Sequence, residues 1–306
     1  MRRSFGMKLG GLVPKYARSI ADLPALAAEF ERMGVDDVIH GEHILFAPRM
    51  PHPGEPAATH GRTGRRSDVS DVTVLLTAIA TRTTRLKVVT GVVLAAAHPF
   101  ALLAKQTATL DVLSGGRLVL GVGSGWFADE FAAMGIPFQD RYAIMEETVR
   151  AVRKLWTSDI SSFAGKWINY ENMVSEPAPV TPGGVPVWWG GKSTAAMARR
   201  VATMGDGWIA AQAASYDDIA LGMERIEAAC GRAGRDFAEV GVRVTLPRMP
   251  GEGPWAKDAV IEHAVAAERR LSGLGVTHYT IPLDLYRLEL DATEELVAVL
   301  AGDERC

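Results

Sequence analysis

The sequence predicts an α/β fold, namely a (β/α)8 TIM barrel. Strand-like and helix-like runs alternate along the whole chain, and the alternation repeats eight times without a point at which the order of the units reverses. Strands joined by helices over short connections form a parallel sheet whose faces the helices cover. The length of 306 residues also fits one barrel, which takes about 250 residues plus insertions. An open doubly wound sheet is the alternative, and the even spread of the units favours the barrel.

The most regular part of the chain is residues 86–156. A β-branched run at 86–94 precedes an amphipathic pattern at 98–113, and a second strand at 118–123 leads to a long helix at 141–156. The same alternation continues on both sides. The expected strands, in order, are 7–12, 36–40, 86–94, 118–123, 186–191, 207–211, 240–246 and 277–282. The expected helices are 22–33, 72–83, 98–113, 141–156, 193–204, 216–233, 258–273 and 293–300.

Residues 158–185 interrupt this alternation. The stretch has the pattern of a small strand pair with a loop, so we expect an insertion between the fourth and fifth units. No linker composition or low-complexity tract divides the chain, which predicts a single domain over residues 1–306. Two long loops, 47–70 and 247–255, are rich in Pro and Gly, and loops of this kind are usually functional.

The composition argues against several classes of partner. A formal net charge of −3 leaves no basic excess for a nucleic acid. No apolar run approaches the ~20 residues that span a bilayer, and no sustained apolar segment follows the start of the chain. We therefore expect no membrane partner and no secretory signal. Cys230 and Cys306 are too few for a disulfide framework, so we expect a cytoplasmic protein.

The second strand runs into Gly41-Glu42-His43, at the end of the barrel where chemistry is usually located. A carboxylate beside an imidazole suits a proton donor or a general base. A solvated loop pair is the more common meaning of such a dipeptide and stays open. A metal site through His40 and His43 lacks further ligands at a metal-binding spacing, so we expect no metal.

Glycines mark the third and fourth strand ends. Gly91 interrupts a β-branched run, which indicates either a close approach to a ligand or an accommodation of packing. The fourth strand continues as Gly121-Val122-Gly123-Ser124-Gly125-Trp126. A dinucleotide fingerprint would need glycine at 126, so Trp126 excludes it. The glycines leave the backbone without side chains, and an indole follows them. This pattern favours a flat ligand ring that packs against the backbone, and a plain tight turn is the less favoured alternative.

The fifth strand ends in Gly190-Gly191-Lys192-Ser193 and opens a helix. The free N–H groups at the start of a helix and the charge of Lys192 suit the binding of an anion. The alternative interpretation is that this stretch only caps the helix. The double glycine favours a phosphate, although the upstream glycine of a P-loop is missing. Four charged residues near the fourth strand end and the long helix are expected to form structural ion pairs. They are Glu130, Arg141, Glu146 and Glu147.

Taken together and in this order, these motifs resemble the bacterial luciferase-like superfamily of flavin- and deazaflavin-dependent TIM-barrel oxidoreductases. The likeness covers nearly the whole chain. The residues that carry the resemblance lie in the ranges 104–111, 114–117, 121–126, 141–156, 185–193 and 205–208. The branch described as probable oxidoreductases using the deazaflavin coenzyme F420 is the most similar, because a second strand end like Gly41-Glu42-His43-Ile44-Leu45 also occurs there.

The resemblance implies roles for the residues at the strand ends. His43 would handle a proton near the reacting ring atom and Glu42 would contact the cofactor, so both are candidate catalytic residues. Gly91-Val92 match the position of a non-proline cis peptide that supports the ring. The further cofactor contacts that the resemblance implies are Ser124, Gly125, Trp126 and Asp129 at the ring or tail, and Gly190, Gly191, Lys192 and Ser193 at the phosphate.

The activity that the resemblance implies is hydride transfer between F420 and a small organic substrate, held by Trp126 and the loop 47–70. An FMN-dependent monooxygenase that uses reduced FMN and dioxygen is the alternative, since Glu-His at 42–43 is also the luciferase form. That enzyme would need a separate cofactor reductase. Glucose-6-phosphate dehydrogenases of the family carry a catalytic Glu where Trp126 stands, so their substrate is not expected. Relatives with this barrel are commonly dimers, which implies a homodimer.

Two hypotheses from other classes are weaker. A cofactor-binding protein without turnover would not need the Glu42-His43 pair, which is intact in this sequence. A metal-dependent barrel hydrolase would need ligands that the sequence does not offer.

Overall fold

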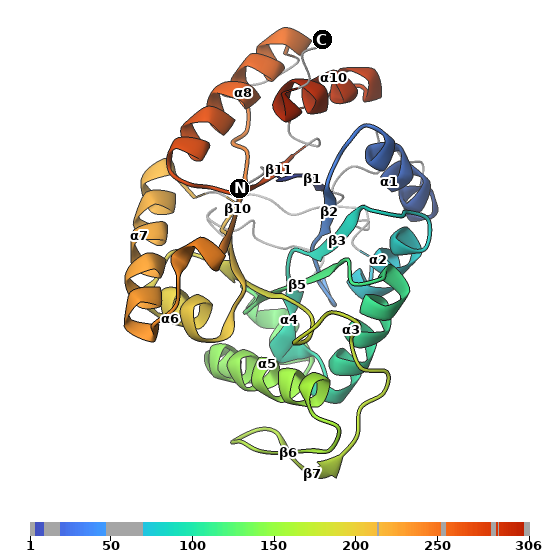
Figure 1. Cartoon of the computed structure of the whole chain (residues 1–306), viewed down its shortest axis with the longest axis vertical. Helices are drawn as coiled ribbons and strands as arrows, with labels where there is room; N and C mark the ends of the chain where they lie inside the picture. Colours follow the sequence, from blue (N-terminus) through green and yellow to red (C-terminus); the bar gives the residue numbers. More distant parts are fainter. Residues whose placement is uncertain are drawn as a thin grey trace.

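The computed structural model describes residues 4–8, 19–46, 70–212, 214–251, 255–282, 286 and 288–302. In this part of the chain, eight parallel strands form a closed barrel (Figure 1). In barrel order they are β1 (Ser4–Lys8), β2 (Asp37–His40), β3 (Lys87–Thr90), β5 (Leu118–Gly123), β8 (Val187–Gly191), β9 (Gly207–Ala210), β10 (Gly241–Thr245) and β11 (His278–Ile281). The pairing of β1 with β11 closes the ring, and a short ninth strand, β4 (Val93–Leu94), lies beside β5.

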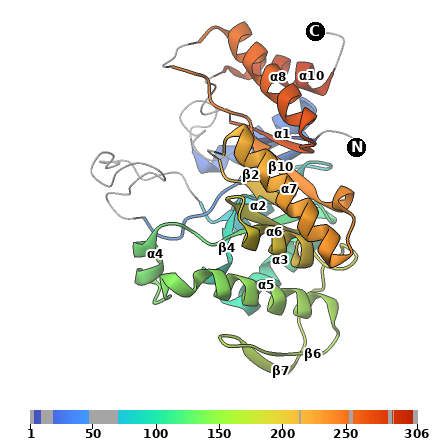
Figure 2. The same cartoon turned by 90° about the vertical axis from the view of Figure 1, so that its left-hand side faces the viewer.

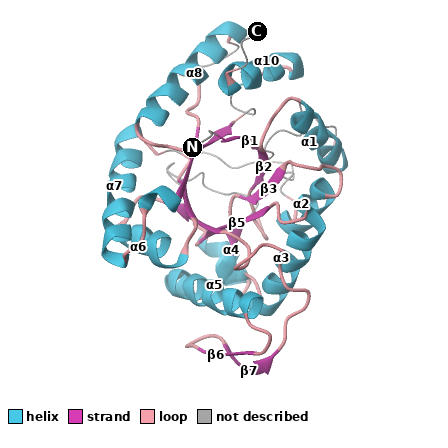
Figure 3. Cartoon of the chain, in the orientation of Figure 1, coloured by secondary structure: helices cyan, strands magenta, loops and turns pink. Residues whose placement is uncertain are grey.

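The helices form a layer outside the ring of strands (Figure 3). They are α1 (Leu23–Arg32), α2 (Val72–Ala80), α3 (Phe100–Ser114), α4 (Ala128–Ala133), α5 (Arg141–Thr157), α6 (Ala195–Met204), α7 (Tyr216–Ala233), α8 (Lys257–Gly273) and α10 (Leu290–Ala301). Single 3-10 turns lie at η1 (Ile20–Asp22), η2 (Ala95–Ala97), η3 (Phe138–Asp140) and η4 (Phe237–Glu239). None of the helices in the described residues is long and apolar enough to cross a membrane.

Side-chain caps explain where several helices begin and end. Asp71 accepts the backbone N–H of Val74 at the start of α2, and Ser215 forms a capping box with Asp218 at the start of α7. Helix α7 ends at Gly234, whose φ of 69° is a left-handed conformation that glycine adopts without steric cost.

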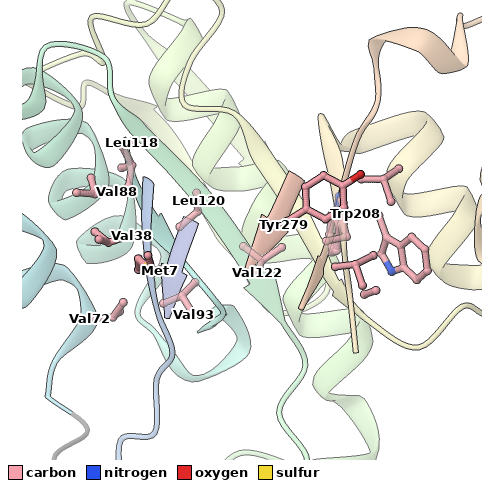
Figure 4. Close-up of a cluster of buried hydrophobic side chains, with 14 of the residues drawn as sticks. Met7, Val38, Val72, Val88, Val93, Leu118, Leu120, Val122, Trp208 and Tyr279 are labelled. Atoms are coloured by element: carbon pink, nitrogen blue, oxygen red, sulfur yellow. The ribbon is translucent and has the colours of Figure 1, made fainter. Parts of the chain in front are cut away.

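Apolar side chains from strands and helices pack into one core. Figure 4 shows part of it, in which strand residues such as Val38 and Val88 lie near Val72 of α2. All three are fully buried. Parallel strands that carry apolar residues on both faces require this cover of helices, which is why alternating strands and helices predicted the architecture.

A buried ion pair lies inside the barrel, near the end where the strands begin. Arg243 of β10 contacts the Asp37 carboxylate at the first residue of β2, with 2.5 Å between Nη2 and Oδ2. Both side chains are almost fully buried. Gly6 leaves room for the pair, since an added Cβ would lie 1.9 Å from Asp37 Oδ1. Arg243 also donates to Thr280 Oγ1 of β11 at 3.2 Å, so the pair links three strands.

The insertion is an antiparallel hairpin of β6 (Ser161–Ala164) and β7 (Asn169–Met173), which lies beyond α5 in both views (Figures 1 and 2). Glu147 of α5 holds its turn, because the carboxylate accepts the backbone N–H groups of Lys166, Trp167 and Ile168 at 3.0, 2.7 and 2.6 Å. The small strand pair expected at 158–185 is therefore present between α5 and β8.

The predicted barrel is confirmed, and the differences concern element boundaries. The first strand was misplaced: it begins at Ser4 rather than at residue 7, and residues 9–12 lie outside the described residues. The run at 86–94 divides into β3 and β4, with a cis peptide bond between Gly91 and Val92. Helix α4 was not expected, because it follows a glycine-rich turn and has only six residues.

Candidate active site

The predicted site residues follow strands whose carboxyl ends adjoin one another. The register pairs His40 with Thr90 between β2 and β3, and Val122 with Trp189 between β5 and β8. Since neighbouring strands are parallel, the residues after them emerge at the same end of the barrel. The residues brought together in this way are Glu42, His43, Gly91, Val92, Ser124, Gly125, Trp126, Gly190, Gly191, Lys192 and Ser193.

His43 is held by a carboxylate on a different element. Its Nδ1 lies 2.9 Å from Oε2 of Glu130 on α4. The other carboxylate oxygen accepts the backbone N–H groups of Ile44 at 2.5 Å and Leu45 at 3.0 Å. Burial alone would raise the pKa of Glu130, but its hydrogen bonds from His43 and from these backbone groups outweigh burial and lower the pKa. Glu130 is therefore an ionised acceptor at neutral pH.

Aromatic rings flank the imidazole of His43. Trp126 meets it edge to face with 5.7 Å between ring centroids, and Phe46 lies at 5.0 Å. Trp126 is 38% exposed, so an apolar surface lies beside the imidazole. His43 Nε2 forms no hydrogen bond with another described residue, which leaves this nitrogen for an external group.

Glu42 points its carboxylate toward His98 and the backbone of β4. His98 Nε2 lies 3.1 and 2.9 Å from the two carboxylate oxygens, and Leu94 donates its N–H at 2.8 Å. Burial alone would lower the pKa of His98, but the hydrogen bond and the charge of Glu42 outweigh burial and raise the pKa. The pair ties the end of β2 to β4 and to the segment before α3.

Val92 follows the cis peptide and lies against glycines of two neighbouring strands. A Cβ added to Gly123 of β5 would lie 2.2 Å from Val92 Cγ2, and one added to Gly190 of β8 would lie 2.5 Å from Val92 Cγ1. Gly91 itself has no room for a side chain, because a Cβ there would lie 2.3 Å from Ile39 Cδ1. These glycines make room for packing within the barrel end, and Val92 stays half-buried above them.

A family model described as luciferase-like monooxygenase matches residues 6–295. The chain belongs to the luciferase-like family. An uncharacterised protein of Mycobacterium tuberculosis is 31% identical over 252 residues, which cover 74% of this chain and 89% of that protein. The FMNH2-dependent dimethylsulfone monooxygenase of Pseudomonas putida is 33% identical over 168 residues, which cover 54% of this chain and 45% of that protein.

Two solved structures share the fold at low sequence identity. Monooxygenase RslO1 from Streptomyces bottropensis has a TM-score of 0.78 and 20% identity, with 98% of both chains covered. An F420-dependent secondary alcohol dehydrogenase in complex with an F420-acetone adduct has a TM-score of 0.74 and 16% identity, with 98% of this chain and 99% of that chain covered. A monooxygenase and an F420-dependent dehydrogenase are therefore both similar in architecture to this chain.

Three further residues that were predicted to contact the cofactor lie on or just after the turn that follows β5. Ser124 and Gly125 are half-buried after β5, where the carbonyl oxygen of Gly125 accepts a hydrogen bond of 3.2 Å from Arg141 Nε. Asp129 is exposed in the first turn of α4. The predicted cofactor contacts of these residues stay predictions.

The predicted phosphate loop leads into α6. Thr194 is the N-cap and accepts the N–H of Met197 at 3.1 Å, while Lys192 is exposed just before it. The guanidinium of Arg225 donates to the carbonyl of Ser193, so a second cation lies beside the loop. Among the described residues, no group of three or more His, Cys, Asp or Glu side chains could hold a metal.

Glu130 and His98 are the site residues that sequence reasoning missed. Glu130 was expected in a structural ion pair, and its partner is the candidate catalytic His43, 87 positions away in the sequence. Glu146 does pair with Arg199 and Arg200 as expected. Arg141 and Glu147 differ, because the described hydrogen bonds of both are with backbone groups. The guanidinium of Arg141 also lies over the rings of Phe138 and Tyr142. The one available signal for Glu130 was its place four residues after Trp126, beyond a strand end.

Proposed function

We propose that the chain is an oxidoreductase that transfers a hydride between the deazaflavin coenzyme F420 and a small organic substrate. The observation that carries the proposal is the imidazole of His43, held through Nδ1 by Glu130 and open at Nε2, at the same barrel end as the Gly91-Val92 peptide. Hydride transfer to or from a carbonyl, imine or activated alkene also needs a proton, and an imidazole such as that of His43 can give or take it.

The residues at the strand ends fit a flat ring with an anionic tail. Val92 and Gly125 are half-buried at the barrel end, and Trp126 presents an exposed indole. Lys192 is exposed at the start of α6, where backbone N–H groups and the helix dipole favour an anion. We propose that Val92, Ser124 and Gly125 hold the ring, and that residues 190–193 hold the phosphate. When bound, F420 supplies or accepts the hydride.

The protein's own residues would bind, orient and handle the proton. Trp126 and Phe46 would exclude water from the side of His43 that faces the substrate, since both rings already contact the imidazole. His43 would give a proton to the substrate oxygen or nitrogen during reduction and take it back during oxidation. Glu42, with both oxygens bound by His98 and Leu94, would fix the backbone on either side of the site.

Turnover under anaerobic conditions tests this proposal. Reduced F420 is mixed with a panel of carbonyls, imines and activated alkenes, and its oxidation is followed by absorbance. We expect turnover with at least one class, and a loss of about 10²- to 10⁴-fold in kcat for His43→Asn. Turnover that is unchanged in His43→Asn would remove the role assigned to His43.

The second candidate is a monooxygenase that uses reduced FMN and dioxygen. It is favoured by the 33% identity to the FMNH2-dependent dimethylsulfone monooxygenase of Pseudomonas putida over 168 residues. A separate reductase would then supply the reduced FMN. Oxygen uptake coupled to loss of substrate would support this candidate, whereas turnover that proceeds equally well without oxygen would exclude it.

We also propose a cytoplasmic homodimer built from one domain that acts on a small molecule. The support for the homodimer is the family resemblance, and a net charge of −3 favours a small-molecule substrate over a nucleic acid. Residues 47–69 of the loop 47–70, which we expect to contact the substrate, lie outside the described residues, as do residues 252–254 of the loop 247–255. Light scattering on the purified chain measures its oligomeric state directly.

A further inference from the structure

Glu130 contacts both the imidazole of His43 and the backbone that follows it. One carboxylate oxygen lies 2.9 Å from His43 Nδ1, and the other accepts the N–H groups of Ile44 and Leu45. The residue is 1% exposed, so water does not compete for these hydrogen bonds. Three donors therefore converge on one buried carboxylate, and they fix the position of the ring and of the chain at the end of β2.

This contact determines which ring nitrogen carries the proton. An ionised carboxylate can only accept hydrogen bonds, so a neutral imidazole beside it must carry its proton on Nδ1. The lone pair of His43 is then on Nε2, across the ring from Glu130. Nε2 is also the nitrogen that makes no hydrogen bond with another described residue. The tautomer and the free hydrogen-bonding position therefore both indicate that Nε2 is the atom that faces a substrate.

We propose that Glu130 is a positioning residue that sets the tautomer of His43, so that Nε2 is the atom that exchanges the proton with the substrate. The redox step rests on the proposed function. During oxidation of an alcohol the O–H proton passes to Nε2 of His43 while the hydride leaves the carbon for F420. Reduction of the carbonyl reverses both transfers, so the atoms and electrons balance. The tautomer itself does not depend on which coenzyme binds.

The tautomer can be measured without any cofactor. Two-dimensional 15N–1H NMR of the histidine rings distinguishes the Nδ1–H form from the Nε2–H form, and the signal of His43 is the one that disappears in His43→Gln. For the neutral ring we expect the Nδ1–H form in the unaltered protein. A His43 signal in the Nε2–H form would overturn the proposal, and this result needs no change at Glu130.

The variant Glu130→Gln reverses the polarity of one contact while it keeps the others. The amide oxygen can still accept the N–H groups of Ile44 and Leu45, whereas the NH2 group would face His43 Nδ1 as a donor. The imidazole must then move its proton to Nε2. We expect the NMR signal to change to the Nε2–H form and kcat to fall by about 10²-fold, with little change in KM.

Glu147→Gln is the matched control, since Glu147 is also a buried carboxylate that binds backbone N–H groups, but in the hairpin turn. It should keep the Nδ1–H signal and kcat. Equal losses of kcat in the two variants, or an unchanged kcat in Glu130→Gln despite the altered signal, would overturn the positioning role. If neither coenzyme supports turnover, the proposed function fails, and the NMR signals still decide whether Glu130 sets the tautomer of His43.

Discussion

Replacing Gly190 with alanine tests whether the glycines at the strand ends make room for Val92. The added Cβ would lie 2.5 Å from Val92 Cγ1, well inside van der Waals contact. The backbone of Gly190 is not in a positive-φ conformation, so packing alone determines the effect. Forcing an extra methyl group into a packed site destabilises proteins by about 1–3 kcal/mol. We expect a loss in this range in the free energy of unfolding, measured with urea and tryptophan fluorescence.

A double-mutant cycle identifies Val92 as the cause. Val92→Ala removes the methyl group that the new Cβ would meet, so Gly190→Ala in that background should cost less than about 0.5 kcal/mol. Gly231→Ala is the control: it lies within α7, and a Cβ there meets nothing within 4 Å. It should be neutral or stabilising by up to about 1 kcal/mol. Additive effects of Gly190→Ala and Val92→Ala would refute the packing argument, and so would a Gly190→Ala variant as stable as the unaltered protein.

Three further predictions concern charged groups. Arg243→Met leaves the Asp37 carboxylate buried without its partner and should destabilise the barrel by about 3–5 kcal/mol in urea unfolding. The pKa of His98 is raised in the folded protein by its pair with Glu42. The stability that this pair contributes is therefore complete below the ordinary pKa of 6.5 and is lost as pH rises through the raised pKa. His98→Gln should remove this fall in the free energy of unfolding from a series of urea unfolding curves at different pH values. Lys192→Ala should weaken coenzyme binding about tenfold in a fluorescence titration without changing the urea midpoint, and an unchanged affinity would remove Lys192 from the phosphate site.

The sequence predicted the barrel because periodicity is a local property. The strand at 118–123 and the helix at 216–233 match β5 and α7 residue for residue, since each lies between clear turn signals. The first strand was misplaced because Ser4–Lys8 alternates weakly, whereas residues 7–12 are richer in apolar side chains. Helix α4 has too few residues for a periodic pattern to be recognised.

For the candidate site, the sequence identified positions but not partners. Topology places Glu42 and His43 at a strand end, and that follows from the order of elements alone. The contact of His43 with Glu130 joins residues 87 positions apart, and that of Glu42 with His98 joins residues 56 positions apart. No local pattern encodes such pairs. For the same reason Gly91 could be read as a ligand contact or as packing until Ile39 was located against it.

Coenzyme binding tests most directly whether this luciferase-like barrel uses F420 for hydride transfer, as we propose. The purified chain is titrated with F420 and, separately, with FMN, while quenching of tryptophan fluorescence is followed; Trp126, beside His43, is well placed to report binding. We predict tight binding of F420 and weak binding of FMN. Tight binding of FMN alone would contradict the account and identify an enzyme that uses dioxygen.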